Sequence, residues 1–369
     1  MKQSKIDSFI ILVDERNKDN HDYPVLGINK DKTFMPTAAN MEGIDTCKYK
    51  VVKKGTFVFS GMQTGRDMCI RIGLYDKDIP ALISPAYTTF VLDETKGVLP
   101  EYFFLTFNRE ESDRYGAFIS DSSVRANLDW NRFLDIEIPL PSLAEQQKAV
   151  NAWRALREIK EQNEAIAAPL MQVCQSYIQE LKHGQTLYKR IGDYIKIFDK
   201  TNKDGKNYPV YGLNKDKTFM PTVANTENVN LNKYKIVEKG LFAYSGMQTG
   251  RDVCIRIAYY DMDSPALISP AYSTFIIEEQ KGILSEYFML LFKHSEMDRL
   301  GWFYSDSSIR SNLDWSRFVD IQIPLPPLSV QQAIVNIYNC ANEAKRIAAE
   351  ADRMSRKVCP ALIQHVIHY

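Results

Sequence analysis

One stretch of sequence occurs twice and decides the fold: Asn29-Lys-Asp-Lys-Thr-Phe-Met-Pro-Thr37 returns unchanged at residues 214–222. A second stretch, Ser60-Gly-Met-Gln-Thr-Gly-Arg-Asp67, returns at residues 245–252. Nearly the whole chain follows the same pattern, without a gap, at a constant offset of 185 residues. Each copy is long enough to form a hydrophobic core of its own. The repeat therefore predicts two similar domains in one chain.

The composition is that of a folded protein without membrane segments. Of the 369 residues, 45% are hydrophobic and 25% are charged, which are ordinary proportions for a globular chain. No apolar run approaches the roughly 18 residues that a membrane helix needs, and Met1–Lys5 leads into no signal-peptide core. We therefore expect a cytoplasmic protein without membrane contact. The six cysteines form no CxxC motif, which favours reduced, mostly buried thiols.

The charges balance, because 46 basic side chains face 46 acidic ones. A chain of zero net charge does not hold a polyanion through its overall field alone. Local basic surfaces remain compatible with nucleic-acid binding. If nucleic acid is the ligand, the neutrality implies that another subunit supplies part of the backbone affinity.

Each copy begins with a strand-rich part. Its aromatic and β-branched runs are separated by Gly, Pro and Asn, a pattern typical of a curved sheet. Strands are predicted at residues 56–59, 69–72, 88–92 and 136–141. A helix is expected over residues 99–108, with Pro100 in its first turn, and over residues 284–293 in the second copy.

A long helix follows each strand-rich part. Ser142-Leu-Ala-Glu145 has the spacing of a capping box, so the first helix should start there. Apolar residues then recur at spacings of three and four, as in a coiled-coil seam. The predicted seam comprises Leu156, Ile159, Asn163, Ile166, Leu170, Val173 and Tyr177 in the first copy, and Ile334, Ile337, Ala341, Ala344, Ala348, Ala351, Ser355, Val358 and Leu362 in the second. The alternative is an amphipathic helix that packs on its own domain. We expect Pro169 to kink the first helix and Pro360 to bend or end the second.

These patterns predict an α+β protein in which two similar globular domains are joined by two long helices. The expected parts are a first domain over residues 1–141, a helix over 142–185, a second domain over 186–326 and a helix over 327–369. Because the second domain starts where the first helix ends, its own helix must run back. We therefore expect an antiparallel coiled coil and a pseudo-two-fold symmetric chain.

The sequence carries no recognisable catalytic motif. It has no GxxxxGK[ST] phosphate loop, no (N/D)PP(Y/F) motif of an amino-methyltransferase, no GxSxG elbow and no set of zinc ligands. We therefore expect a chain that is not an enzyme and that holds neither a cofactor nor a metal.

The strictly repeated polar loops are the candidate binding sites. In Ser60–Asp67 two glycines would let the backbone approach a ligand closely, while polar side chains project hydrogen-bond donors. Arg paired with guanine and Gln paired with adenine are the usual matches for reading base edges. The candidates are Gln63, Thr64 and Arg66, with their counterparts Gln248, Thr249 and Arg251. The alternative is a hairpin in which Arg66 and Asp67 pair with neighbouring charges.

Further cations accompany these loops. Lys30 and Lys32, repeated as Lys215 and Lys217, are suited to phosphates, although the intervening Asp31 makes a solvated turn equally compatible. Another repeated segment covers residues 120–130 and 305–315, and its Asp121, Asn127 and Asp129 are typical of turns and helix caps. Arg125 and Arg310 are the members of this segment expected to reach outward.

The boundary between strands and helix carries a family resemblance. Ile138-Pro-Leu-Pro-Ser-Leu-Ala-Glu-Gln-Gln147 and Ile323-Pro-Leu-Pro-Pro-Leu-Ser-Val-Gln-Gln332 each precede a long helix. This arrangement resembles the DNA-specificity subunit of type I restriction-modification systems over essentially the whole chain. The segment Gly61–Arg66 fits that family's Gly-x-Thr-x-Gly-basic loop with one extra residue. The first copy lacks much of the lead-in found at Tyr188–Asp193, so a frayed start is expected for the first domain.

The resemblance implies a function and partners. Such a subunit reads a bipartite site in double-stranded DNA with two target-recognition domains. Its helices bind two methyltransferase subunits, which carry S-adenosylmethionine, and restriction subunits can join. Because the repeated loops are nearly identical, we predict a near-palindromic target. Two alternatives stay open: a partner chain in which methyltransferase and nuclease are fused, and a coiled-coil protein adaptor that binds no DNA.

Overall fold

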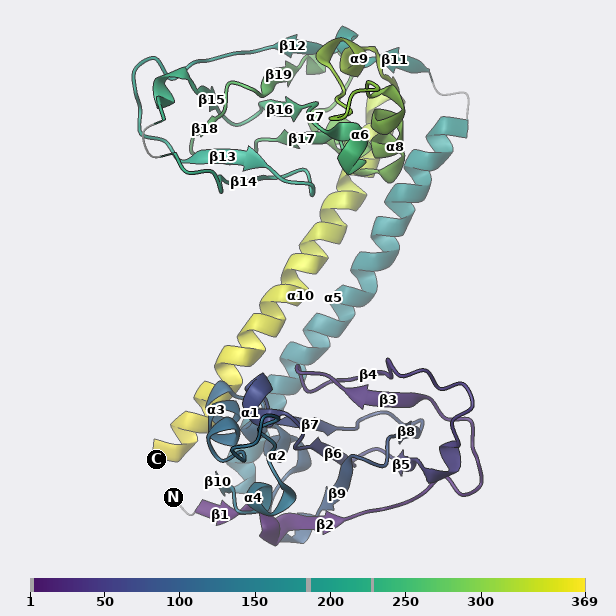
Figure 1. The fold of residues 1–369 in the computed structure, drawn as a ribbon, viewed down its shortest axis with the longest axis vertical. Helices are drawn as coiled ribbons and strands as arrows, with labels where there is room; N and C mark the ends of the chain where they lie inside the picture. The colour runs from purple at the N-terminus through teal and green to yellow at the C-terminus, as the bar shows by residue number, and fades with distance from the viewer. Residues whose placement is uncertain (1–2, 184–186, 227–228, 369) are drawn as a thin grey trace. The chain divides into compact units, whose positions relative to one another are not determined.

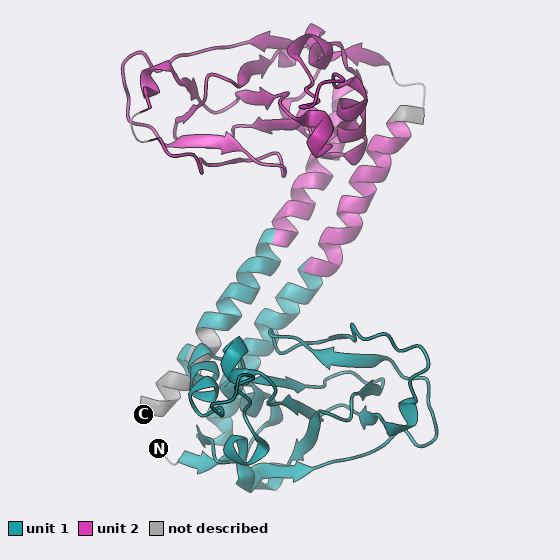
Figure 2. Cartoon of the chain, in the orientation of Figure 1, with its two compact units in different colours: residues 1–163, 346–369 teal, residues 164–345 magenta. Residues whose placement is uncertain are grey.

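The computed structural model describes residues 3–183, 187–226 and 229–368. The chain forms two compact units (Figure 2): residues 1–163 with 346–369 make unit 1, and residues 164–345 make unit 2. Each unit contains one globular domain, called domain 1 and domain 2 below, and about half of each long helix. The duplication predicted from the sequence is therefore present in the fold.

Domain 1 has two four-stranded sheets and one strand pair (Figure 1). The first sheet has the order β2 (Ile10–Leu12), β9 (Thr88–Leu92), β6 (Phe57–Ser60) and β7 (Arg71–Leu74). The second has the order β4 (Phe34–Pro36), β3 (Val25–Ile28), β8 (Ala81–Ile83) and β5 (Lys50–Val52). All neighbours are antiparallel except β3 and β8. Strands β1 (Gln3–Lys5) and β10 (Glu137–Pro139) form the antiparallel strand pair, which joins the beginning and the end of the domain sequence.

Short helices cover the first sheet of domain 1. They are α1 (Thr64–Asp67), α2 (Pro100–Phe107), α3 (Glu110–Phe118) and α4 (Trp130–Leu134), with 3-10 turns at Ile6–Phe9, Thr46–Lys48 and Glu94–Lys96. The core is aromatic: Phe57 stacks on Phe90 with ring centroids 5.0 Å apart, and both meet the edge of Phe103 from α2. The expected helix over residues 99–108 and the expected strand over 88–92 are confirmed.

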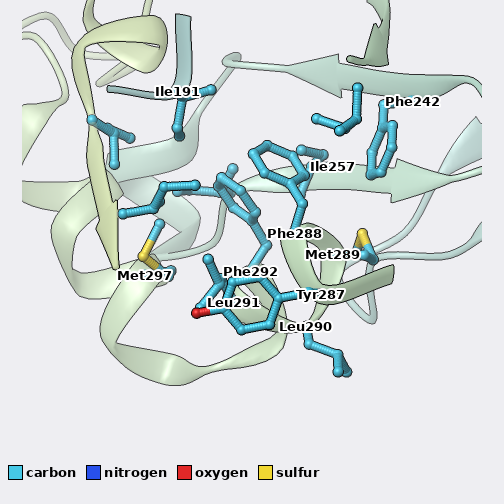
Figure 3. Packing of buried hydrophobic residues seen from close by; sticks show 14 of the residues in the cluster. Ile191, Phe242, Ile257, Tyr287, Phe288, Met289, Leu290, Leu291, Phe292 and Met297 are labelled. Atoms are coloured by element: carbon cyan, nitrogen blue, oxygen red, sulfur yellow. The ribbon is translucent and has the colours of Figure 1, made fainter. Parts of the chain in front are cut away.

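Domain 2 repeats this order. Its first sheet has the order β12 (Ile195–Ile197), β19 (Ser273–Ile277), β16 (Phe242–Ser245) and β17 (Arg256–Tyr259). Its second has the order β14 (Phe219–Pro221), β13 (Val210–Leu213), β18 (Ala266–Ile268) and β15 (Lys235–Val237). The strand pair is β11 (Tyr188–Arg190) with β20 (Gln322–Pro324). Its helices are α6 (Thr249–Asp252), α7 (Ser285–Lys293), α8 (Ser295–Tyr304) and α9 (Trp315–Asp320), with 3-10 turns at Ile191–Asp193, Leu231–Lys233 and Glu279–Lys281. Figure 3 shows the α7 side chains Phe288 and Phe292 in the buried cluster that includes Phe242 and Ile257.

The expectation of a frayed start in domain 1 was wrong. Strand β1 pairs with β10 in the register Gln3 opposite Pro139, just as Tyr188 stands opposite Pro324 in domain 2. Main-chain pairing does not depend on side-chain identity, so the divergent lead-in still completes the strand pair.

Two helices of equal length follow the domains: α5 (Leu143–His183) and α10 (Leu328–His368). Neither Pro169 nor Pro360 ends its helix. In unit 1, Lys160 Nζ lies 2.8 Å from Asp352 Oδ1, and Leu362 packs in a cluster with Trp153. In this unit the residue numbers of α10 fall as those of α5 rise, so the pairing is antiparallel, as predicted.

The seam predicted on α10 is confirmed, whereas the seam predicted on α5 was partly misplaced. The α10 residues Ile334, Ala341, Ala344, Ala348 and Ala351 are buried, while the Val358 side chain lies outside the described residues. On α5, Ile159, Ile166, Val173 and Tyr177 are each 40% or more exposed, and Ala167, Cys174 and Ile178 are buried instead. Adjacent stripes on a helix can share the same seven-residue period, so periodicity does not identify which of them is buried.

Candidate nucleic-acid interface

Two loops of domain 1 are held together by hydrogen bonds. We call residues 60–68 the glycine loop and residues 120–127 the turn loop. Gly65 N donates to Ala126 O at 2.8 Å, and Gln63 N donates to Asn127 Oδ1 at 2.9 Å. Leu128 N donates to Gly61 O at 2.8 Å. In domain 2 the equivalent bonds are Gly250 N to Ser311 O, Gln248 N to Asn312 Oδ1 and Leu313 N to Gly246 O.

The glycines permit this close packing. A Cβ at Gly61 would lie 1.7 Å from Leu128 O, and one at Gly65 would lie 2.7 Å from Ala126 Cβ. The Cβ of a residue replacing Gly246 would also lie 1.7 Å from Leu313 O. The close approach expected between these glycines and a ligand is therefore taken up by the chain itself.

Left-handed backbone conformations mark both loops. Gln63, Met68 and Ala126 have φ of 59°, 51° and 49°. Their counterparts Gln248, Val253 and Ser311 have φ of 60°, 46° and 51°. Such conformations cost a non-glycine residue about 1–2 kcal/mol each and persist only where surrounding contacts impose them. The loops therefore have a fixed shape.

Two pairs of the candidate residues are buried, and their polar atoms are bound inside their own domains. Thr64 is fully buried and its hydroxyl donates to Gly61 O at 3.1 Å, an arrangement that Thr249 repeats with Gly246 O. Lys32 is buried, and its Nζ contacts both carboxylate oxygens of Asp113 at 2.8 and 2.7 Å. The same pair recurs as Lys217 and Asp298. We assign Thr64, Lys32 and their counterparts to the support of the loops, because their polar atoms are already bound inside the domain.

The other candidate cations surround one carboxylate. Asp67 Oδ1 lies 3.5 Å from Lys30 Nζ and 3.3 Å from Arg66 Nε, and Asp67 Oδ2 pairs with Arg71. We call Lys30, Arg66, Arg71 and Asp67 the cation cluster, whose formal charge is +2. The Lys30 and Arg66 side chains remain 62% and 56% exposed. Arg66 does pair with a neighbouring charge, as the hairpin alternative proposed, but it stays accessible.

Electrostatics keeps this carboxylate ionised. Burial works to raise the pKa of Asp67, yet Lys30, Arg66 and Arg71 together hold it below its ordinary value. In domain 2 burial again opposes Arg256, Lys215 and Arg251, which lower the pKa of Asp252. Arg66 also donates to Gln63 Oε1, and Arg251 to Gln248 Oε1 at 2.7 Å. Each Gln side-chain oxygen is thus bound by the arginine of its own loop.

Sequence reasoning missed Arg71 and Arg256 as members of the cation clusters. Arg71 stands opposite Ser60 in the pairing of β6 with β7, so the sheet register brings it beside the glycine loop. The i to i+4 spacing from Asp67 to Arg71 was the available signal. The Arg71 Nε and Arg256 Nε atoms are buried and have no hydrogen-bond partner in the described part of the chain.

The turn loop presents Arg125. Residues Ser123–Ala126 form a turn closed by a 2.9 Å bond from Ala126 N to Ser123 O. Asp121 Oδ1 accepts from the main-chain N–H groups of Ser123 and Asn127, both at 3.0 Å. The Ser123 hydroxyl, followed by these N–H groups, holds the pKa of Asp121 below its ordinary value. Arg125 and its counterpart Arg310 are exposed and make no ion pair with any residue that the structure describes.

The described residues contain neither a candidate metal site nor a candidate membrane helix. Over residues 3–183, 187–226 and 229–368 no group of His, Cys, Asp and Glu could hold a metal ion. No helix in the described part of the chain is long and apolar enough to cross a membrane. Cys47, Cys69, Cys174, Cys254 and Cys340 are free thiols, three of them buried, while the Cys359 side chain lies outside the described residues.

Comparison with known proteins finds a matching family model and similar solved structures. The family model described as the type I restriction modification DNA specificity domain matches twice, at residues 7–168 and 188–339. The S subunit of a type I restriction-modification system from M. genitalium shares the fold, with a TM-score of 0.63 and 15% identity over 99% of this chain and 95% of that one. The HsdS subunit from Thermoanaerobacter tengcongensis matches over 99% of this chain and 96% of its own, with 16% identity and a TM-score of 0.40. No curated protein matches.

The fold and the repeated loops define a two-domain protein with paired helices and two equivalent cationic sites. The two matches of the family model cover most of the chain, which therefore belongs to the type I restriction-modification DNA specificity family. This membership confirms the expectation of a specificity subunit without catalysis of its own.

Proposed function

We propose that each domain reads one half of a bipartite site in double-stranded DNA through its cation cluster and turn loop. The observation that carries this proposal is the cluster itself. A chain of zero net charge concentrates a formal +2 beside the rigid glycine loop of each domain, and two of the three cations are exposed. The Arg66 guanidinium can donate two hydrogen bonds to the edge of a guanine base, and the Lys30 ammonium group suits a phosphate. S-adenosylmethionine would be carried by the methyltransferase partner.

The target should have two related halves. The segments 60–67 and 245–252 are identical, and both hold the same hydrogen bonds. Nearly identical recognition loops should select closely related short sequences, so the two halves should be near copies in inverted orientation. Mapping methylated adenines in cells that express this subunit with its cognate methyltransferase tests the idea. Two unrelated halves would contradict it.

Single-domain variants test the role of the arginines. Arg251→Gln should relax specificity in one half-site only, at a cost of about 1–3 kcal/mol. Arg66→Gln is the matched variant and should relax the other half. Equal weakening on every duplex would instead make both arginines phosphate contacts. Failure of the full chain and its complex to retain any duplex selectively would favour a protein adaptor.

The helices offer a docking surface for the methyltransferase subunits. In unit 2, Ile166 and Val173 lie seven residues apart on α5 and are about half exposed, and Tyr177 follows one turn later. A row of exposed apolar residues on a helix is a common protein contact surface. We propose that this row, Ile166, Val173 and Tyr177, binds the methyltransferase.

Co-purification tests this docking. Val173→Glu should abolish recovery of the methyltransferase because it places a charge in an apolar contact, while helix content measured by circular dichroism stays unchanged. The exposed neighbour Gln172→Glu is the control and should retain the partner. Normal recovery with Val173→Glu would exclude this surface. The mass of the recovered chain distinguishes a separate methyltransferase from a fused methyltransferase-nuclease, and also reports restriction subunits.

A further inference from the structure

The two turn loops each carry a fully exposed branched aliphatic residue inside the turn. Val124 is 99% exposed and Ile309, its counterpart, is 100% exposed. Each residue lies at a corner of a tight turn, directly before Arg125 or Arg310. Such corners commonly hold Gly, Pro, Asn, Asp or Ser. A side chain without neighbours adds nothing to the core, so neither residue is explained by the stability of its domain.

We call Val124 and Ile309 the apolar tips. Hydrogen bonds fix the backbone around each of them. The Asp121 carboxylate binds the N–H groups of Ser123 and Asn127, and Gly65 N binds Ala126 O. Asp306 and Gly250 make the same contacts in domain 2. The tip is thereby fixed to the glycine loop, which carries Arg66 of the cation cluster. A loop whose backbone is already fixed loses little conformational entropy on binding.

We propose that Val124 and Ile309 enter a groove of the DNA and contact base atoms, so that they help determine sequence specificity. This inference rests on the proposed function. The partner of each tip must accept an apolar group and a guanidinium on adjacent residues. A DNA groove does so, because phosphates line its rims and thymine methyl groups and base edges lie inside. The net positive charge of the neighbouring cation cluster favours DNA over a protein surface.

The tips also give the two domains different contacts. Ile309 is larger than Val124 by one methylene group, although the glycine loops are identical up to Asp67 and Asp252. The two half-sites should therefore differ in affinity, or at one base position, within an otherwise inverted repeat.

Selection from a pool of random duplexes with the full chain tests the inference. Compared with the wild type, Val124→Ser should lose base preference at one position of one half-site and bind the selected duplex about fivefold to tenfold more weakly, the scale of partly burying a valine. Ile309→Ser should do the same in the other half. The salt dependence should not change, because an apolar contact releases no counterions. Ile79→Ser is the control, because Ile79 is also an exposed aliphatic residue of domain 1 but lies outside both loops.

Several outcomes would overturn the inference. Unchanged selection and affinity for Val124→Ser would show that the tip does not touch DNA. Equal weakening on all duplexes would assign the tip to loop support, and loss of the methyltransferase with intact DNA selection would assign it to that partner. If the wild-type chain selects a sequence and the variant behaves identically, this inference alone fails. If the wild-type chain selects no sequence, the proposed function fails with it.

Discussion

Replacing Lys32 by Met would remove one partner of a buried ion pair and leave the other behind. Lys32 is 3% exposed in its side chain, and Asp113 is 20% exposed. Breaking a buried pair in this way costs about 3–5 kcal/mol. Asp113 keeps a 2.8 Å bond from Ile70 N, so we expect the lower end, about 3 kcal/mol. Lys32→Met with Asp113→Asn should recover part of this loss because no unpaired charge remains.

Lys30, two residues earlier, is the matched comparison. Its side chain is 62% exposed and its contact with Asp67 is 3.5 Å long. Lys30→Met should therefore change the free energy of unfolding by less than about 0.5 kcal/mol. It should instead weaken DNA binding and reduce the salt slope by about one ion.

Urea unfolding of the full chain, followed by tryptophan fluorescence, measures the first effect. Domain 1 and domain 2 can unfold separately, so the transition of domain 1 is the one to compare. DNA affinity measured at several salt concentrations gives the second effect. Lys30→Met should bind more weakly, whereas folded Lys32→Met should match the wild type. A Lys32→Met variant that unfolds at the wild-type urea concentration but shows a smaller salt slope would refute this reasoning and place Lys32 on the DNA.

Two further predictions concern the backbone of the loops. Gly61→Ala should destabilise domain 1 by more than about 4 kcal/mol, because its Cβ would meet Leu128 O. Gly27→Ala is the comparison: its Cβ would lie 3.5 Å from the Tyr87 hydroxyl oxygen, an ordinary contact, and should cost less than about 1 kcal/mol. Val253→Asn should raise the unfolding free energy by about 1 kcal/mol, because Asn tolerates the left-handed conformation that a β-branched residue does not. Urea unfolding checks each variant, and a neutral Gly61→Ala would contradict the loop packing.

The duplication and the aromatic strands were predictable, because both appear as local patterns. The helix α3 was not predicted. Its sequence is mostly polar, and Gly116 is its buried member in the domain. It packs there because a Cβ on Gly116 would lie 2.4 Å from Ile70 Cγ1, which means that the helix contacts the core through its backbone. A helix that packs through glycine leaves no apolar stripe in the sequence.

The sequence predicted which loops form the candidate site, but it did not predict which way their side chains point. Residue type identified Lys30 and Lys32 alike as phosphate ligands, yet one is exposed and the other is buried against Asp113. Lys32 has a left-handed backbone with φ of 60°, and its Nζ meets Asp113, which lies 81 residues further along the chain. Arg71 was missed because its i to i+4 spacing from Asp67 does not by itself show that the strand register brings the two side chains together. Both facts depend on tertiary structure that a single sequence does not encode locally.

Salt dependence tests whether these exposed cations account for the DNA affinity of a chain without net charge. Each domain exposes three of the candidate cations, which are Lys30, Arg66 and Arg125 in domain 1. Arg66 and Arg251 are assigned to bases, so if both domains bind, about four phosphates can be neutralised, which predicts a slope of log K against log salt of about −3.6 and a loss of about 150-fold between roughly 50 and 200 mM salt.

Asp67→Asn makes this test sharper. Removing the carboxylate raises the local charge by one and frees Arg66 from its ion pair. We expect a steeper slope and tighter binding to unrelated duplexes, but weaker discrimination, because Arg66 is no longer held in place. Titrations of a target duplex and a scrambled duplex over the same salt range measure all three quantities. A wild-type slope shallower than about −2 would mean that the cations keep their own carboxylate partners in the complex. In that case the affinity would have to come from the partner subunits.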